Sequence, residues 1–279
     1  MTSSNLWERS DCWLGQLAAM NAAKRRRNLN YFCALCGPIA GGFFISCFIG
    51  SGFLPPIHPS WSAERSLEHY QAHQTGIHVG SALMMFSGAF FIPFYCLVAD
   101  QMQRIPNLPW ILPQLQLASG TASTIGFFLP GMQLAVAAFR RDREPMLLEL
   151  ANDSFWLFAI MPFTSFFRLC WSWGFAILLD TREKPPFPKF MAVANFIVPF
   201  MFLWSTAIHA THSNAFAWNG GLGFWTPLGV FGCQFIGDTY YLLKAIYKDY
   251  LLEVEQLSAD GSGELAASSI RSERLKAEP

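Results

Sequence analysis

Three histidines have the residue type and placement that a metal site needs. His69 and His73 are four residues apart in the segment 62–73, which is predicted to form a short helix after Pro59. That spacing puts both imidazoles on one helix face, and His209 could complete the site from elsewhere in the chain. Imidazole also works as a base near neutral pH. The competing interpretation is that these side chains only fill a polar boundary, so a metal ion stays an alternative and no catalytic residue is assigned.

Two charged residues interrupt otherwise apolar stretches. Arg168 lies in 163–173, and Asp238 lies in 237–240. Charges inside a bilayer are costly, and they usually face the interior of the bundle and pair. Both residues lie at similar distances from the same end of their stretches, so helices would put them at similar depth. The sequence therefore predicts that the two charges face each other or a common polar cavity, where they would either bind a substrate or proton or simply join two helices. With two buried amides they form the predicted ligand-binding set: Arg168, Asp238, Asn195 and Gln234.

The elements that must position these residues are six long apolar stretches. A transmembrane helix needs about 20 mostly apolar residues. The predicted fold is accordingly all-α, a polytopic bundle of about six transmembrane helices. Its spans are predicted near 30–54, 78–98, 109–139, 154–179, 190–209 and 221–247. This domain of residues 30–250 is flanked by an N-terminal segment, 1–29, and a tail predicted to be disordered, 251–279. The N-terminal segment is interpreted as either an interfacial amphipathic helix or a disordered arm.

Composition agrees with a membrane protein. Hydrophobic residues make up 52% of the chain and charged residues only 14%, against about 25% charged in soluble domains. The formal net charge is zero, which removes the electrostatic argument for a nucleic-acid partner. The expected partners are the lipid bilayer and a small lipophilic molecule, with homo-oligomerisation left open.

Basic residues beside the spans predict the orientation of the chain. Positive charge is retained in the cytoplasm, so the cluster from Lys24 to Arg27 predicts that both termini are inside. Other basic residues then fall on that side: Arg104, Arg182, Lys184, Lys189, Lys244 and Lys248. Three disagree and fall outside, namely Arg140, Arg141 and Arg143. All six histidines also fall outside: His58, His69, His73, His78, His209 and His212.

Two connections, 139–156 and 214–227, are distinctive in composition. They resemble stretches of uncharacterised multi-span bacterial inner-membrane proteins that have no assigned activity. This resemblance implies a multi-pass protein of the plasma (inner) membrane and supplies no functional residue. The leading hypothesis for function is binding or passage of a small, largely apolar molecule. A membrane enzyme that uses the outer histidines and an accessory or scaffold subunit are the two alternatives.

Overall fold

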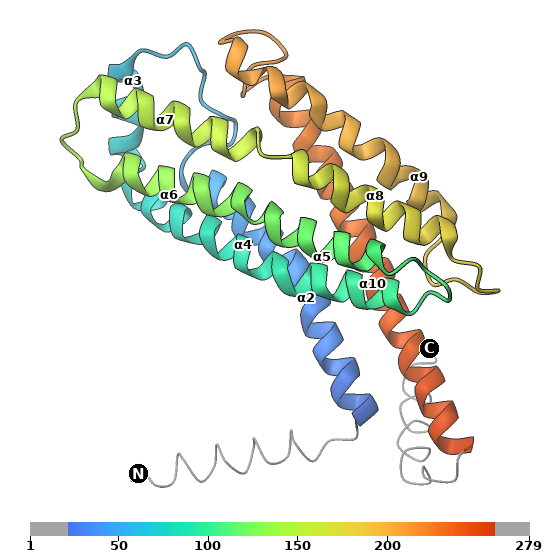
Figure 1. Cartoon of the computed structure of the whole chain (residues 1–279). Coiled ribbons are helices and arrows are strands. Elements are labelled where there is room, and N and C mark those ends of the chain that lie inside the picture. The colour runs from blue at the N-terminus through green and yellow to red at the C-terminus, as the bar shows by residue number, and fades with distance from the viewer. Residues whose placement is uncertain (1–21, 260–279) are drawn as a thin grey trace, which may run out of the picture. The chain divides into compact units, whose positions relative to one another are not determined.

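The computed structural model describes residues 22–259, and this part of the chain is helical with no strand (Figure 1). The α-helices are α2 (Ala22–Gly50), α3 (Ala63–Ala72), α4 (Gln74–Gln103), α5 (Ile111–Ser123), α6 (Ile125–Phe139), α7 (Pro145–Ile160), α8 (Thr164–Leu179), α9 (Lys189–Ile197) and α10 (Thr226–Ala259). A 3-10 helix, η1 (Val198–Ala210), and a short π-helix, η2 (Gly221–Trp225), complete the set. The predicted all-α fold is confirmed. The predicted N-terminal arm lies mostly outside the described residues.

Five helical segments of the described chain are long and apolar enough to cross a membrane. They are Ala22–Gly50, Gln74–Gln103, Ile111–Phe139, Pro145–Leu179 and Lys189–Ala210. They match the first five predicted spans. The sixth predicted span coincides with η2 and α10, which are not among the five. Polar residues such as Gln234 and Asp238 lower the mean hydropathy of α10, so length alone does not qualify it.

The described chain divides into two compact units. The terminal unit contains the described residues 22–32 and 242–259, and the core unit is Cys33–Tyr241. In the terminal unit the Arg26 guanidinium lies 3.4 Å from the Glu253 carboxylate, and Arg27 lies over the ring of Tyr250. Helix α10 continues to Ala259, so residues 251–259 are helical where the sequence predicted the start of a disordered tail.

Within the core unit, three candidate spans are interrupted rather than continuous (Figure 1). Helices α5 and α6 meet at Thr124, whose hydroxyl donates to the Thr121 carbonyl. Helices α7 and α8 are separated by Met161, Pro162 and Phe163, where the proline removes a backbone donor. Helix α9 tightens into η1 immediately before Pro199. Such breaks are tolerated at membrane depth where protein or a cavity surrounds them.

The predicted short helix at 62–73 is confirmed as α3. Its N-terminus is capped by Ser62, whose hydroxyl accepts a hydrogen bond from the Arg65 amide at 3.3 Å. On the buried face of α3, the Tyr70 hydroxyl donates to the Asn152 side-chain carbonyl of α7 at 3.1 Å. Gln71 also donates to the Arg141 carbonyl. These contacts fix α3 against α7 and the connection that precedes it.

Candidate functional site

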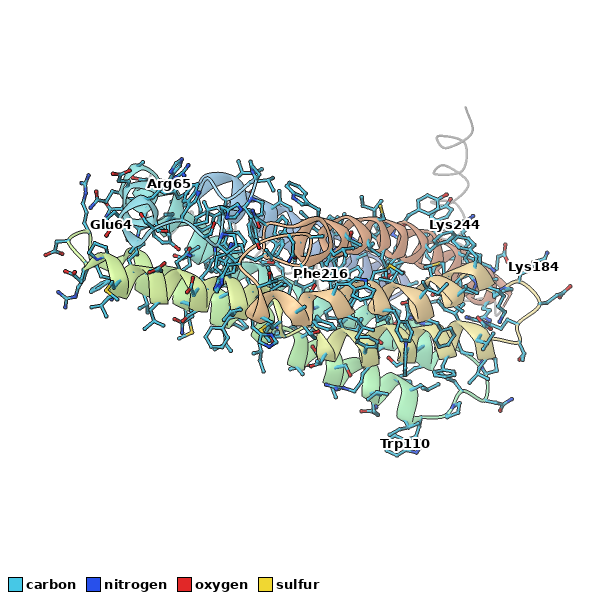
Figure 2. All side chains as sticks on the ribbon, turned by 90° about the horizontal axis from the view of Figure 1, so that it is seen from above. Glu64, Arg65, Trp110, Lys184, Phe216 and Lys244 are labelled. Atoms are coloured by element: carbon cyan, nitrogen blue, oxygen red, sulfur yellow. The ribbon has the colours of Figure 1, made fainter. Side chains whose placement is uncertain are left out.

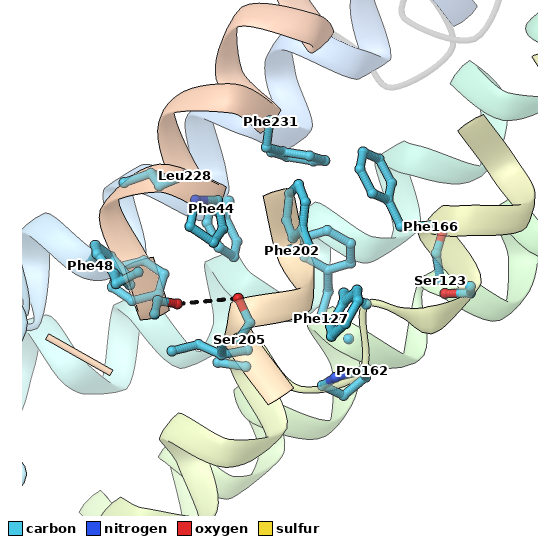
Figure 3. A pocket seen from close by; sticks show the side chains of 18 of the residues that line it. Phe44, Phe48, Ser123, Phe127, Pro162, Phe166, Phe202, Ser205, Leu228 and Phe231 are labelled. Carbon is cyan, nitrogen blue, oxygen red and sulfur yellow. Dashed lines mark hydrogen bonds between the residues drawn. The ribbon is translucent and has the colours of Figure 1, made fainter. Parts of the chain in front are cut away.

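A cavity of about 130 Å³ lies inside the core unit (Figure 3). Nine of its 19 lining residues are aromatic, and Figure 3 shows Phe127, Phe166, Phe202 and Phe231 around the space. These rings come from α6, α8, η1 and α10. They are also packed on one another, with ring centroids 4.9 Å apart for Phe166 and Phe202. Residues distant in the sequence therefore build one apolar chamber.

Several residues in or beside irregular helical segments border this cavity. Ser123 lies directly before the break between α5 and α6, and Pro162 lies in the break between α7 and α8. Ser205 belongs to the 3-10 helix η1, and Gly223 belongs to the π-helix η2. Local 3-10 and π segments within helices frequently mark functional sites. Irregular backbone is thus found in the wall of this cavity.

Two serine hydroxyls in the cavity wall donate hydrogen bonds to backbone carbonyls. Ser205 donates to the Gly223 carbonyl at 3.3 Å, as the dashed line in Figure 3 shows, and Ser123 donates to the Gly120 carbonyl at 2.7 Å. Tyr95 contributes its ring and hydroxyl from α4. Ser123 and Ser205 therefore have less hydrogen-bonding capacity left for a ligand, and the wall presents mainly apolar surface. This arrangement can hold an apolar guest and offers little to a charged one.

Three of the four predicted ligand-binding residues lie together in a polar cluster. The Gln234 side-chain amide donates to the Asn195 carbonyl oxygen at 2.8 Å, and the Asn195 amide donates to the Met191 carbonyl at 2.9 Å. The Asp238 carboxyl lies near the Gln234 amide and the indole of Trp173. The predicted role of these residues in ligand binding stays a prediction, but their proximity is established.

Arg168 is not part of this cluster, and the predicted pairing with Asp238 is wrong. None of the ion pairs among residues 22–259 joins the two, and Arg168 is exposed. Its neighbours Leu169 and Trp173 are buried on the inner face of α8. Successive residues turn by about 100° around a helix axis, so Arg168 points away from that face. Similar depth in the membrane did not ensure the same side of the helix.

The structure brings His69 and His73 together, with ring centroids 4.3 Å apart in a stacked arrangement. His69 Nε2 donates to the Ser51 carbonyl, and His73 Nδ1 donates to the His69 carbonyl, each at 3.0 Å. Burial lowers the pKa of His69, the neighbouring His73 lowers it further, and the Ser51 carbonyl partly opposes them. The neutral imidazole is therefore favoured.

His209 is exposed and bonded to its own helix, through the Thr206 carbonyl at 2.6 Å. Within residues 22–259, no group of three or more His, Cys, Asp or Glu side chains is placed to hold a metal ion. Two of the three predicted metal ligands are thus adjacent, and each already uses one ring nitrogen in a structural hydrogen bond. The metal site stays a prediction.

Sequence reasoning missed the aromatic cavity and Trp173. The signal for the cavity was present in the proline and glycine at irregular helical segments, Pro162 and Gly223. Their meeting at one place requires the tertiary structure. No protein-family model, curated protein or solved structure matches the chain.

Proposed function

We propose that this protein is a multi-pass protein of the plasma (inner) membrane that binds or passes a small, largely apolar molecule through the aromatic cavity. One observation carries the proposal: a cavity of about 130 Å³ has phenylalanine as its most frequent lining residue and is bordered by irregular helical segments, including the break at Pro162. In membrane transporters, discontinuous helices commonly form the substrate site. Five apolar helices support the membrane location.

The size of the cavity suggests the size of its guest. An engineered apolar cavity of about 150 Å³ in another protein stays dry and binds benzene or xenon. The chamber here is of the same order. We therefore infer that a molecule about as large as one aromatic ring fits, and that edge-to-face contacts with the phenylalanines would orient it.

Benzene is expected to stabilise the purified protein in detergent. At a free concentration of about ten times Kd the gain is about 1.4 kcal/mol, which corresponds to a rise in Tm of about 2–4 °C. The substitution Ala159→Phe should abolish this rise because Ala159 lines the cavity and a phenyl group would fill it. Thermal unfolding followed by circular dichroism, with and without benzene, measures both effects.

The matched control is Ala118→Phe, since Ala118 is exposed on α5 and does not line the cavity. That variant should keep the full benzene response, which separates occupation of the cavity from general effects of benzene on the micelle. An equal rise in Tm for Ala159→Phe and the wild type, or no rise in the wild type, would argue against the proposal.

The proposed orientation has six crossings with both termini in the cytoplasm. In support, Gln71 contacts Arg141, so α3 and the connection 140–144 share one end of the core unit. Figure 2 displays Glu64 and Arg65 at that end and Lys184 at the other. The position of the arginines has a local explanation, because Arg143 donates to the Val136 carbonyl at the end of α6 at 2.8 Å.

A cysteine introduced at Asp142 should react with a membrane-impermeant maleimide in intact cells. The seven native cysteines would first be replaced by alanine or serine. A cysteine at Glu183, in the connection after α8, provides the control and should react only after permeabilisation. The six-crossing orientation fails if the two positions show the reverse pattern, or if both are labelled under the same condition.

A further inference from the structure

The polar cluster on α8, α9 and α10 contains an acid that has no basic partner in the core unit. Asp238 is partly buried on α10, beside Gln234 of the same helix and Trp173 of α8. Trp173 and Asn195 are almost completely buried. The titratable groups that interact with the carboxyl are Tyr95 of α4 and Cys170 of α8. Both are neutral while protonated.

Two buried polar atoms beside Asp238 are left without a hydrogen-bond partner. They are Gln234 Oε1, which can only accept, and Trp173 Nε1, which can only donate. The orientation of the Gln234 amide is fixed. Asn195 Nδ2 donates to the Met191 carbonyl, so Asn195 Oδ1 must accept, and Gln234 Nε2 must be its donor. The unpaired atom of Gln234 is therefore an acceptor that needs a proton donor.

The protonation state of Asp238 decides whether the cluster can be satisfied. An ionised carboxylate only accepts hydrogen bonds. It can accept one from Trp173 Nε1, but it has no proton to donate to Gln234 Oε1. A protonated carboxyl has one O–H donor and one carbonyl oxygen. It can therefore donate to Gln234 Oε1 and accept from Trp173 Nε1. An ionised carboxylate without a counter-charge would also be costly among apolar helices. Arg168, which the sequence analysis predicted as the partner of Asp238, faces away from this side of α8.

We propose that Asp238 is a proton-binding site inside the bundle. One proton adds to the carboxylate, and the resulting O–H donates to Gln234 Oε1 while the carbonyl oxygen accepts from Trp173 Nε1. When this proton is lost, the hydrogen bond to Gln234 Oε1 and the neutral state of the carboxyl are lost with it. This inference stands apart from the aromatic cavity, because neither Asp238 nor Gln234 lines that space.

Infrared spectroscopy of the full-length protein in detergent tests the assignment. At about pH 7, where ordinary aspartates with a pKa of about 4 are ionised, the wild type should show the C=O stretch of a protonated carboxylic acid. That band should be missing in Asp238→Asn, which keeps the shape of the neutral acid. It should persist in the control Asp100→Asn, since Asp100 is bonded to Arg104 at 2.7 Å on α4. A wild type without the band, or a band unchanged in Asp238→Asn, overturns the proposal.

The variant Gln234→Leu tests the donor assignment without removing the acid. Loss of the acceptor weakens the hydrogen bond from the carboxyl, so the band should move to higher frequency rather than disappear. An unmoved band would show that Gln234 does not accept this proton. Raising the pH to about 10 should also lower the Tm of the wild type more than that of Asp238→Asn, because only the wild type can lose the proton that bonds Asp238 to Gln234. Equal losses of Tm would contradict the proposal, and all these readouts are independent of benzene binding.

Discussion

The substitution Trp156→Ala is expected to lower the free energy of unfolding by about 3–5 kcal/mol. Trp156 is completely buried on α7 and stacks on Trp218 with ring centroids 5.9 Å apart. Its indole N–H donates to Asn152 Oδ1 at 3.2 Å, the same oxygen that accepts from Tyr70. Alanine would leave a cavity among these rings and remove one of the two hydrogen bonds. Unfolding by denaturant in detergent, followed by circular dichroism, gives the free energy.

The control for this prediction is another tryptophan that faces outward. Trp171 on α8 is 38% exposed and contacts Phe167 and Phe200 at the surface of the core unit. Trp171→Ala should cost about 1 kcal/mol or less, because little buried volume is lost. If the two variants are equally stable, the aromatic cluster around Trp156 does not contribute as the packing indicates.

The substitution Gly76→Ala is expected to cost about 3 kcal/mol or more, or to abolish recovery of folded protein. Gly76 lies in the first turns of α4, where its backbone meets the end of α2. A Cβ atom at this position would overlap the Gly50 carbonyl oxygen. Backbone cannot rotate out of the way as a flexible side chain can, so the two helices would have to separate. Small residues at such contacts allow close helix packing in membranes.

Gly41→Ala provides the comparison within α2. No atom lies within 4 Å of a Cβ built on Gly41, and alanine reduces the entropy of the unfolded chain, so this variant should be neutral or more stable by up to about 1 kcal/mol. Thermal unfolding of both variants in the same detergent separates a steric effect from a general effect of helix propensity. Equal stability of the two variants would refute the close contact between α2 and α4.

The amino-acid sequence by itself determined the helical class, five apolar membrane-length segments and the short helix α3. Length and hydropathy are properties of contiguous residues, so these segments follow from the sequence alone. Proximity along one helix was equally predictable: Gln234 and Asp238 are four residues apart on α10. The side of a helix that faces the bundle is a different property, because it depends on the neighbouring helices.

Only the tertiary structure decided which distant residues meet. Arg168 and Asp238 have suitable depths, but the rotation of α8 turns Trp173 inward and Arg168 outward. The aromatic cavity is likewise assembled from helical segments that are far apart in sequence, from α2 to α10, and Pro162 in the break between α7 and α8 lies in its wall. A proline in the sequence indicates where one helix is interrupted. Which distant segments then meet around a cavity depends on long-range packing, and local sequence patterns do not determine it.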